Sequence, residues 1–187
     1  MSSVASAVLA AALLSACLIS PAFAAEGDDD RGRHLDILGW VEFVEFVDPN
    51  IRLKAKLDTG ATTSSLNALN QKRFKRNGKE WIRFDVEDPD EPENRVTFEA
   101  PVVRNVRIRR HNDETQRRPV VKLGMCVGRI YRERQFSLID RTEFVYQVLV
   151  GRNFLRDHAL VDSGETFLSD PRCKALEDQH ADKRNKD

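Results

Sequence analysis

The sequence predicts an all-β domain with one short helix. Apolar and polar residues alternate at the two-residue period of half-buried strands over many short runs, and Gly, Pro, Asn and Asp separate these runs. Only the segment that follows Gly151 is expected to form a helix, and that helix is short. The chain contains no internal repeat with a period of about 20 to 50 residues, so we expect a single compact domain.

The clearest strand covers residues 51–57, where apolar residues alternate with basic ones. One face of this strand is therefore expected to be buried and the other exposed to water. A segment with two prolines and several acidic residues, 88–94, predicts an exposed turn between two strands. The other expected strands cover residues 38–47, 81–86, 96–103, 106–110, 120–127, 129–139 and 146–150, with a closing pair at 160–162 and 166–168.

Length and composition fit a soluble globular protein. The 187 residues are 41% hydrophobic and 32% charged, which supplies enough apolar material for one core. The chain has 30 acidic and 30 basic residues, and none of them lies in residues 1–25, so the remainder is formally neutral. A neutral domain argues against nucleic acid as a partner.

Residues 1–24 are predicted to be a secretory signal peptide. They contain no charged side chain, include an apolar run from residue 4 to residue 19, and end in Ala22-Phe23-Ala24, which is a cleavage signal. The alternative is that Leu14-Ser15-Ala16-Cys17 is a lipobox, whose cysteine is lipidated. Both interpretations predict a periplasmic or secreted domain, and contact with a membrane is expected only if Cys17 is lipidated.

The mature chain divides into three parts. Residues 25–36 are an acidic, flexible leader, residues 37–170 form the folded domain, and residues 171–187 are a polar tail. Cleavage before Ala25 leaves Cys126 and Cys173 in an oxidising compartment, where a disulfide persists if it forms. A single bridge and two unpaired buried thiols both remain open, because the sequence does not give the distance between the two residues.

Two motifs carry the functional prediction. Leu57-Asp58-Thr59-Gly60-Ala61 ends the strand at residues 51–57 and places one carboxylate on a tight turn, which Gly60 permits. This triplet by itself is also ordinary turn chemistry. The second motif is Val148-Leu149-Val150-Gly151-Arg152-Asn153, in which an apolar strand is followed by the expected helix.

The order of these motifs resembles one bacterial family, the retropepsin-like aspartic proteases often labelled ATP-dependent zinc proteases. The resemblance covers about residues 37 to 170 and implies a retropepsin-like acid-protease barrel. The motifs that carry it, besides the two above, are Gly39-Trp40, Ser64-Ser65-Leu66-Asn67-Ala68, Glu99-Ala100-Pro101-Val102-Val103, Arg118-Pro119-Val120-Val121 and Ser137-Leu138-Ile139-Asp140-Arg141.

The resemblance implies an aspartic endopeptidase that hydrolyses peptide or protein substrates. Asp58, Thr59 and Gly60 would form the catalytic loop, and a homodimer would bring two copies of Asp58 together. Residues expected to support this loop are Ala61, Gly151, Arg152 and Asn153.

The sequence leaves two questions about this site open, the partner of Arg152 and the role of Asp162. Thr62 and Thr63 stand where retroviral enzymes usually carry acidic residues, so we expect Arg152 to pair with another carboxylate, either Asp140 or Asp157. Asp162-Ser163-Gly164 imitates a second catalytic loop, but it is also a standard hairpin turn, and too few residues follow it to build a second lobe.

A basic hairpin between the two motifs is the candidate flap over the substrate. Its residues are Arg107, Arg109, Arg110, His111, Asn112 and Asp113. A basic flap would favour acidic substrates, whereas the ordinary alternative is a solvated hairpin whose charges oppose pairing of sheet edges.

The family label mentions zinc and ATP, but the sequence contains a binding motif for neither. The sequence has no His-Glu-x-x-His pair for a catalytic zinc ion and no glycine-rich loop ending in Lys-Ser or Lys-Thr for phosphates. We therefore expect no cofactor and no metal. The alternative function is a binding or scaffold module that keeps the fold without proteolysis, and a metal-dependent or ligase-associated role is a third.

Overall fold

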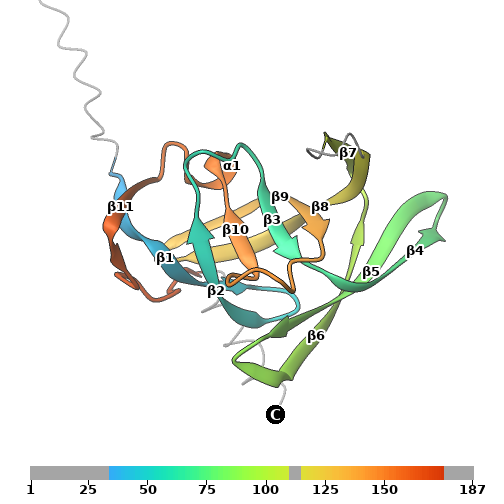
Figure 1. The fold of residues 1–187 in the computed structure, drawn as a ribbon, viewed down its shortest axis with the longest axis horizontal. Coiled ribbons are helices and arrows are strands. Elements are labelled where there is room, and N and C mark those ends of the chain that lie inside the picture. The colour runs from blue at the N-terminus through green and yellow to red at the C-terminus, as the bar shows by residue number, and fades with distance from the viewer. Residues whose placement is uncertain (1–33, 110–114, 175–187) are drawn as a thin grey trace, which may run out of the picture. The chain divides into compact units, whose positions relative to one another are not determined.

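The computed structural model describes residues 34–109 and 115–174 (Figure 1). The expected signal peptide with its lipobox alternative, most of the leader, the tip of the candidate flap and most of the tail lie outside these residues. The elements are β1 (Asp36–Phe46), β2 (Ile51–Leu57), β3 (Ser64–Asn67), β4 (Leu69–Arg76), β5 (Lys79–Asp88), β6 (Glu91–Pro101), β7 (Arg104–Arg109), β8 (Thr115–Val127), β9 (Ile130–Ile139), β10 (Val148–Val150), α1 (Arg152–Leu155) and β11 (Ala159–Thr166).

Eight strands form one sheet that closes into a barrel. Their order is β11-β1-β2-β10-β3-β9-β8-β7, and an additional pairing of β1 with β8 joins the sheet to itself. Closure leaves β11 and β7 as extensions beyond the closed ring. The predicted all-β fold with a short helix after Gly151 is confirmed, and α1 is far too short to cross a membrane.

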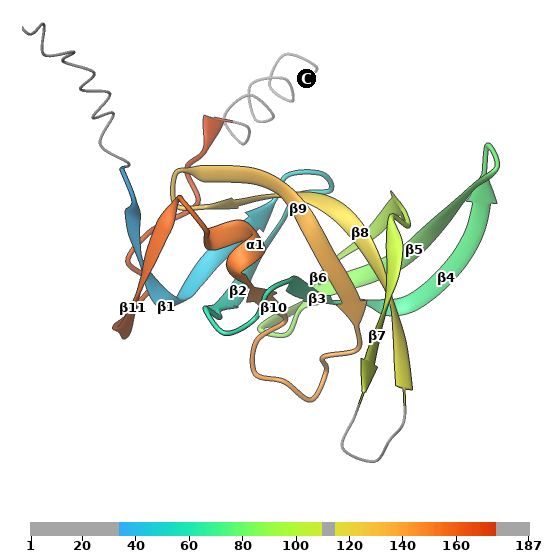
Figure 2. The ribbon, with the colours of Figure 1, turned by 90° about the horizontal axis from the view of Figure 1, so that it is seen from above.

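A second sheet, β4-β5-β6, packs against the barrel through aromatic side chains. Phe98 of β6 contacts Phe46 of β1 edge to face, with ring centroids 5.8 Å apart, and stacks on Phe84 of β5. Phe46 also contacts Phe136 of β9, so the aromatic cluster is continuous from the second sheet into the barrel. Figure 2 shows the β4–β5 hairpin extending away from the barrel.

The structure departs from the expectation most at β3, β4 and β11, and β6 begins inside the turn expected at residues 88–94. The sequence analysis did not anticipate β3 and β4, because β3 is short and rich in hydroxyl residues and β4 carries mostly charged and polar side chains. The expected closing pair is wrong, because residues 159–166 form the single strand β11, which pairs in parallel with β1. The pairing of β1 with β11 is irregular between Gly39 and Val41 of β1. This irregularity accommodates the residues of β11 that were expected to form a turn.

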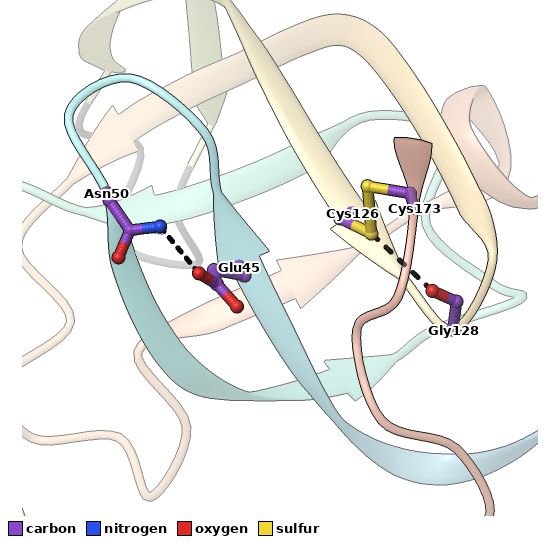
Figure 3. The surroundings of a disulfide bond; sticks show 5 residues. All are labelled: Glu45, Asn50, Cys126, Gly128 and Cys173. Atoms are coloured by element: carbon purple, nitrogen blue, oxygen red, sulfur yellow. Dashed lines mark hydrogen bonds between the residues drawn. A yellow bond between two sulfur atoms is a disulfide. The ribbon is translucent and has the colours of Figure 1, made fainter. Parts of the chain in front are cut away.

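Two contacts hold the segment after β11 against the barrel. Cys126 of β8 forms a disulfide with Cys173, at a Cα separation of 6.1 Å, so the structure selects the bridge from the two alternatives (Figure 3). Glu42 of β1 is fully buried, and its carboxylate accepts hydrogen bonds from the backbone amides of Gly39, Leu168 and Ser169. These amides satisfy a carboxylate that would otherwise be costly to bury.

Candidate active site

Asp58 follows the last residue of β2 and is partly exposed. Its amide donates to the Val150 carbonyl oxygen of the neighbouring β10 at 2.8 Å. Its Oδ1 accepts from the amides of Gly60 and Ala61 at 2.9 and 3.1 Å. Within the described residues no hydrogen bond reaches Oδ2. Two backbone amides therefore fix one carboxylate oxygen, and none of the described residues bonds to the other.

The loop after Asp58 crosses the start of α1. The amides of Arg152 and Asn153 donate to the carbonyl oxygens of Ala61 and Thr62 at 2.9 and 3.0 Å. A Cβ on Gly151 would lie 2.9 Å from the backbone of Thr63, so only glycine lets the two segments approach this closely. The two sequence motifs thus meet in space.

Asn153 is the polar centre of this crossing. Its Oδ1 accepts from the amide and the hydroxyl of Ser64 at 3.1 and 2.8 Å, and its Nδ2 donates to the Gln135 carbonyl oxygen at 2.8 Å. The buried Ser64 hydroxyl in turn accepts from the Gly151 amide at 3.0 Å. Sequence reasoning assigned no role to Ser64, and the run of hydroxyl residues after Ala61 was the signal available for it.

Arg152 contacts the Asp58 loop rather than a carboxylate. Its Nη1 donates to the carbonyl oxygens of Thr59 and Gly60 at 2.8 and 2.7 Å, and its Nη2 donates to the Thr62 hydroxyl at 3.0 Å. The expected pairing with Asp140 or Asp157 is wrong, because backbone carbonyls take the guanidinium donors. Asp140 instead accepts from the Thr142 hydroxyl and amide, and these bonds hold its pKa below the ordinary value.

The chain matches a known protein family over most of its length. A model described as "RimB-like: Retropepsin-like aspartic endopeptidase RimB" matches residues 37–172, which is most of the chain. The chain belongs to the RimB-like family. The barrel, the short helix α1 and the contact between the Asp58 loop and the Gly151 segment are therefore those of a retropepsin-like fold.

Similar proteins carry different names. A crystal structure of Lpg0085, a Legionella pneumophila protein of unknown function, is 34% identical with a TM-score of 0.64, covering 72% of this chain and 98% of that one. Probable alpha-L-glutamate ligases of Shewanella pealeana and Parasynechococcus marenigrum are 32% and 33% identical over 62% and 69% of this chain. The RimB-like chain spans only 25% and 28% of those two ligases.

The RimB-like barrel contains a pocket of about 370 Å³ beside the Asp58 loop. Residues 61–63 of this loop form one wall, and side chains of β7 and β8 form another. The lining residues are Ala61, Thr62, Thr63, Ser65, Val106, Ile108, Arg118, Ser137, Arg141 and Leu149. Two of them, Arg118 and Arg141, are cationic, and no acidic residue lines the pocket.

Arg141 is 8% exposed, which is unusual for an arginine. Its Nε donates to the Tyr146 carbonyl oxygen at 3.2 Å, its Nη1 donates to the Ser65 hydroxyl at 3.1 Å, and its guanidinium lies 4.5 Å from the centroid of the Phe144 ring. In residues 34–109 and 115–174, no carboxylate forms an ion pair with it. Sequence reasoning used Arg141 only as part of a family motif and assigned it no role.

The surroundings of Arg141 disfavour the positive charge of its guanidinium. Burial lowers the pKa of its guanidinium, the neighbouring charge of Arg118 lowers it further, and the carboxylate of Asp58 opposes both effects. An arginine nevertheless stays ionised at physiological pH. A buried charge without an ion-pair partner is less favourable than the same charge in water.

The candidate flap is only partly described. β7 and β8 pair as an antiparallel hairpin up to Arg109 and Thr115, and Arg110, His111, Asn112 and Asp113 lie outside the described residues. Val106 and Ile108 of β7 line the pocket, whereas Arg107 is exposed and does not line it. This division follows the alternation of side chains along a strand.

Asp162 does not lie in a second loop of the Asp58 type. It belongs to β11, opposite Gly39 of β1, and its Oδ1 accepts from the Gly164 amide at 2.8 Å. The described residues also contain no group of three or more His, Cys, Asp and Glu placed to hold a metal ion. His34 and His158 are the histidines within that part of the chain.

Proposed function

We propose that this RimB-like chain is an aspartic endopeptidase whose active site forms when two copies bring their Asp58 carboxylates together. The observation that carries the proposal is the Asp58 loop itself. Two backbone amides fix Oδ1, while Oδ2 accepts no hydrogen bond from the described residues. A carboxylate at a strand end, fixed on one oxygen and open on the other, suits a shared catalytic pair.

The proposed chemistry needs two carboxyl groups about 3 Å apart that share one proton, because two carboxyl groups at that distance do not both ionise. The ionised Asp58 takes a proton from a water that attacks the scissile carbonyl carbon. The protonated Asp58 of the other copy donates a hydrogen bond to the carbonyl oxygen as charge develops there. The pair titrates as a unit.

The chain offers one complete loop of this kind, which supports a homodimer. Thr59 is exposed beside Asp58 and is available to bond across the two-fold axis. Arg152, which bonds to the Thr59 and Gly60 carbonyl oxygens, keeps the loop in shape within each copy. An isologous contact would then place the same loop on both sides of the axis.

The test compares wild type, Asp58→Asn and Asp162→Asn on an unbiased peptide mixture, with mass spectrometry of the products. We expect cleavage by wild type and by Asp162→Asn, and a loss of about three orders of magnitude or more in Asp58→Asn. Light scattering is recorded for each variant and should give a dimer for all three. Equal cleavage by Asp58→Asn in a folded dimer would overturn the proposal.

A second candidate is a non-catalytic binding module. The similar proteins favour this candidate, because they are named probable alpha-L-glutamate ligases and not proteases. Most of their length lies outside the segment that they share with this chain, so the shared segment could serve as a binding part of a larger protein. Such a module would bind a peptide or protein and would not depend on Asp58 for turnover. Binding of peptides by wild type and Asp58→Asn with no cleavage by either would select this candidate.

We also propose that the domain works outside the cytoplasm. The disulfide between Cys126 and Cys173 supports this, because such bonds persist in oxidising compartments. The mass of the N-terminal peptide from the periplasmic and membrane fractions tests it. A mature chain that begins at Ala25 indicates signal cleavage, a lipidated Cys17 indicates an anchored form, and an uncleaved chain contradicts the proposal.

A further inference from the structure

We infer that the pocket under β7 and β8 is a carboxylate-binding substrate subsite in which Arg141 is the residue that determines specificity. The inference rests on the proposed function, since it assumes that a peptide passes Asp58. It concerns different side chains, because the amides of Gly60 and Ala61 hold the Asp58 carboxylate, whereas Arg118 and Arg141 give the pocket its charge.

The first argument is the state of the Arg141 guanidinium. A guanidinium has five N–H donors. Two nitrogens of Arg141 donate, to the Tyr146 carbonyl oxygen and the Ser65 hydroxyl, and the described part of the chain provides no carboxylate for the rest. A carboxylate that accepts from the remaining donors would supply the missing counter-charge, and it would do so in the fork geometry that arginine prefers.

The second argument is the composition of the pocket. Arg118 of β8 brings a second positive charge to the same cavity. Hydroxyl groups of Ser65 and Ser137 lie on its lining, and Val106, Ile108 and Leu149 provide an apolar surface. An anion bound here would offset both the burial and the repulsion from Arg118 that lower the pKa of Arg141.

The third argument is position. The wall formed by residues 61–63 belongs to the loop that carries Asp58, and the charge of Asp58 acts on Arg141. A peptide bound at Asp58 would therefore place a nearby carboxylate in the pocket. That carboxylate has two sources, the side chain of an acidic residue next to the scissile bond or the free C-terminus of a short substrate.

The experiment measures binding to the Asp58→Asn protein, so that no probe is consumed. The probes are fluorescent octapeptides with glutamates on both sides of a central phenylalanine–leucine pair, and identical octapeptides with glutamines. Each is made with a free and with an amidated C-terminus. Fluorescence anisotropy is recorded at low salt and at about 0.5 M NaCl, where surface attraction is screened and a buried ion pair is not.

Glutamate probes should bind roughly 10- to 100-fold more tightly than glutamine probes, the factor expected for hydrogen bonds to a charged group, and the preference should persist at high salt. A preference that follows the free C-terminus instead identifies the terminal carboxylate as the ligand. Equal affinities for all four probes, no binding of any of them, or a preference that disappears in salt would overturn the subsite.

Variants assign the effect to Arg141. In the Asp58→Asn background, Arg141→Gln should remove the preference for carboxylate, and Arg141→Lys should keep part of it because the charge remains. Arg95→Gln is the matched control, since Arg95 is an exposed arginine of β6 outside the pocket. A preference that survives Arg141→Gln in a folded protein would overturn the assignment.

The two proposals fail separately. If wild type does not cleave any peptide while the carboxylate preference depends on Arg141, then the subsite stands and the endopeptidase proposal falls. If wild type cleaves with Asp58 but treats glutamate and glutamine probes alike, then the endopeptidase stands and the subsite falls.

Discussion

Two arginines, Arg152 and Arg141, differ in what their guanidinium groups contact. Arg152 is half-buried, and its guanidinium bonds to two carbonyl oxygens and a hydroxyl of the Asp58 loop. Arg141 is more deeply buried, yet its bonds leave it without an ion-pair partner within the described residues. Arg152 therefore stabilises the local fold, whereas Arg141 keeps donors that the described residues do not satisfy with a carboxylate.

This difference separates the two regions. In the crossing of the Asp58 loop and the Gly151 segment, the polar groups of the folded chain satisfy one another. In the pocket around Arg141, the chain carries a buried charge that it does not neutralise. A region of the first kind is expected to determine stability and loop shape, and a region of the second kind is expected to determine what binds.

The largest expected effect on stability lies outside both regions, at the covalent link between β8 and the segment after β11. Reduction of the Cys126–Cys173 disulfide, which closes a sequence separation of 47 residues, should lower the free energy of unfolding by about 4 kcal/mol. Urea unfolding with and without a reductant measures this. The double variant Cys126→Ala, Cys173→Ala should not respond to the reductant. If the reductant leaves the wild-type curve unchanged, the bridge contributes no stability.

Asn153→Ala tests the region in which polar groups satisfy one another. It removes bonds to Ser64 and to the Gln135 carbonyl oxygen, so unfolding should become easier by about 3 kcal/mol, at roughly 1 kcal/mol for each bond. Asn105→Ala is the control, because the exposed side chain of Asn105 on β7 accepts a single hydrogen bond from the described residues, from Arg73. Similar losses for the two variants in chemical denaturation would contradict the importance of the crossing.

Arg152→Gln should have an intermediate effect. Water can reach the carbonyl oxygens that this arginine leaves, so we expect a loss of about 2 kcal/mol in the free energy of unfolding together with reduced cleavage. Arg152→Lys should not restore either property, because a lysine lacks the planar fork. Thermal unfolding and peptide cleavage are measured on the same samples. Full recovery with lysine would mean that charge alone matters at this position.

Arg141→Met should change stability least. Replacing a buried, unpaired charge by an apolar side chain of similar length is often neutral, so the free energy of unfolding should stay within about 1 kcal/mol of wild type. The same variant should lose the preference for glutamate over glutamine probes. A loss of more than about 3 kcal/mol would show that Arg141 is structural, and the contrast with Arg152 would disappear.

The sequence predicted the parts of the fold that depend on local pattern. The strand at residues 51–57 has the predicted bounds, because its alternation is regular and one face is buried. β4 was missed since its pairing with β5, rather than an apolar face of its own, makes it a strand. The segment 159–166 was read as a hairpin because Asp162-Ser163-Gly164 is turn chemistry, and pairing with β1 overrides that local preference.

In the candidate site, too, some features follow from local sequence and others only from the tertiary structure. The sequence determined that Asp58 ends a strand and that Gly151 begins a short helix, because glycine, turn residues and alternation act over a few neighbours. Only the tertiary structure decided that Arg152 bonds to the Asp58 loop and that Arg141 enters a pocket without a counter-charge. Which atoms satisfy a charge depends on segments distant in the chain, and closure of the barrel brings those segments together.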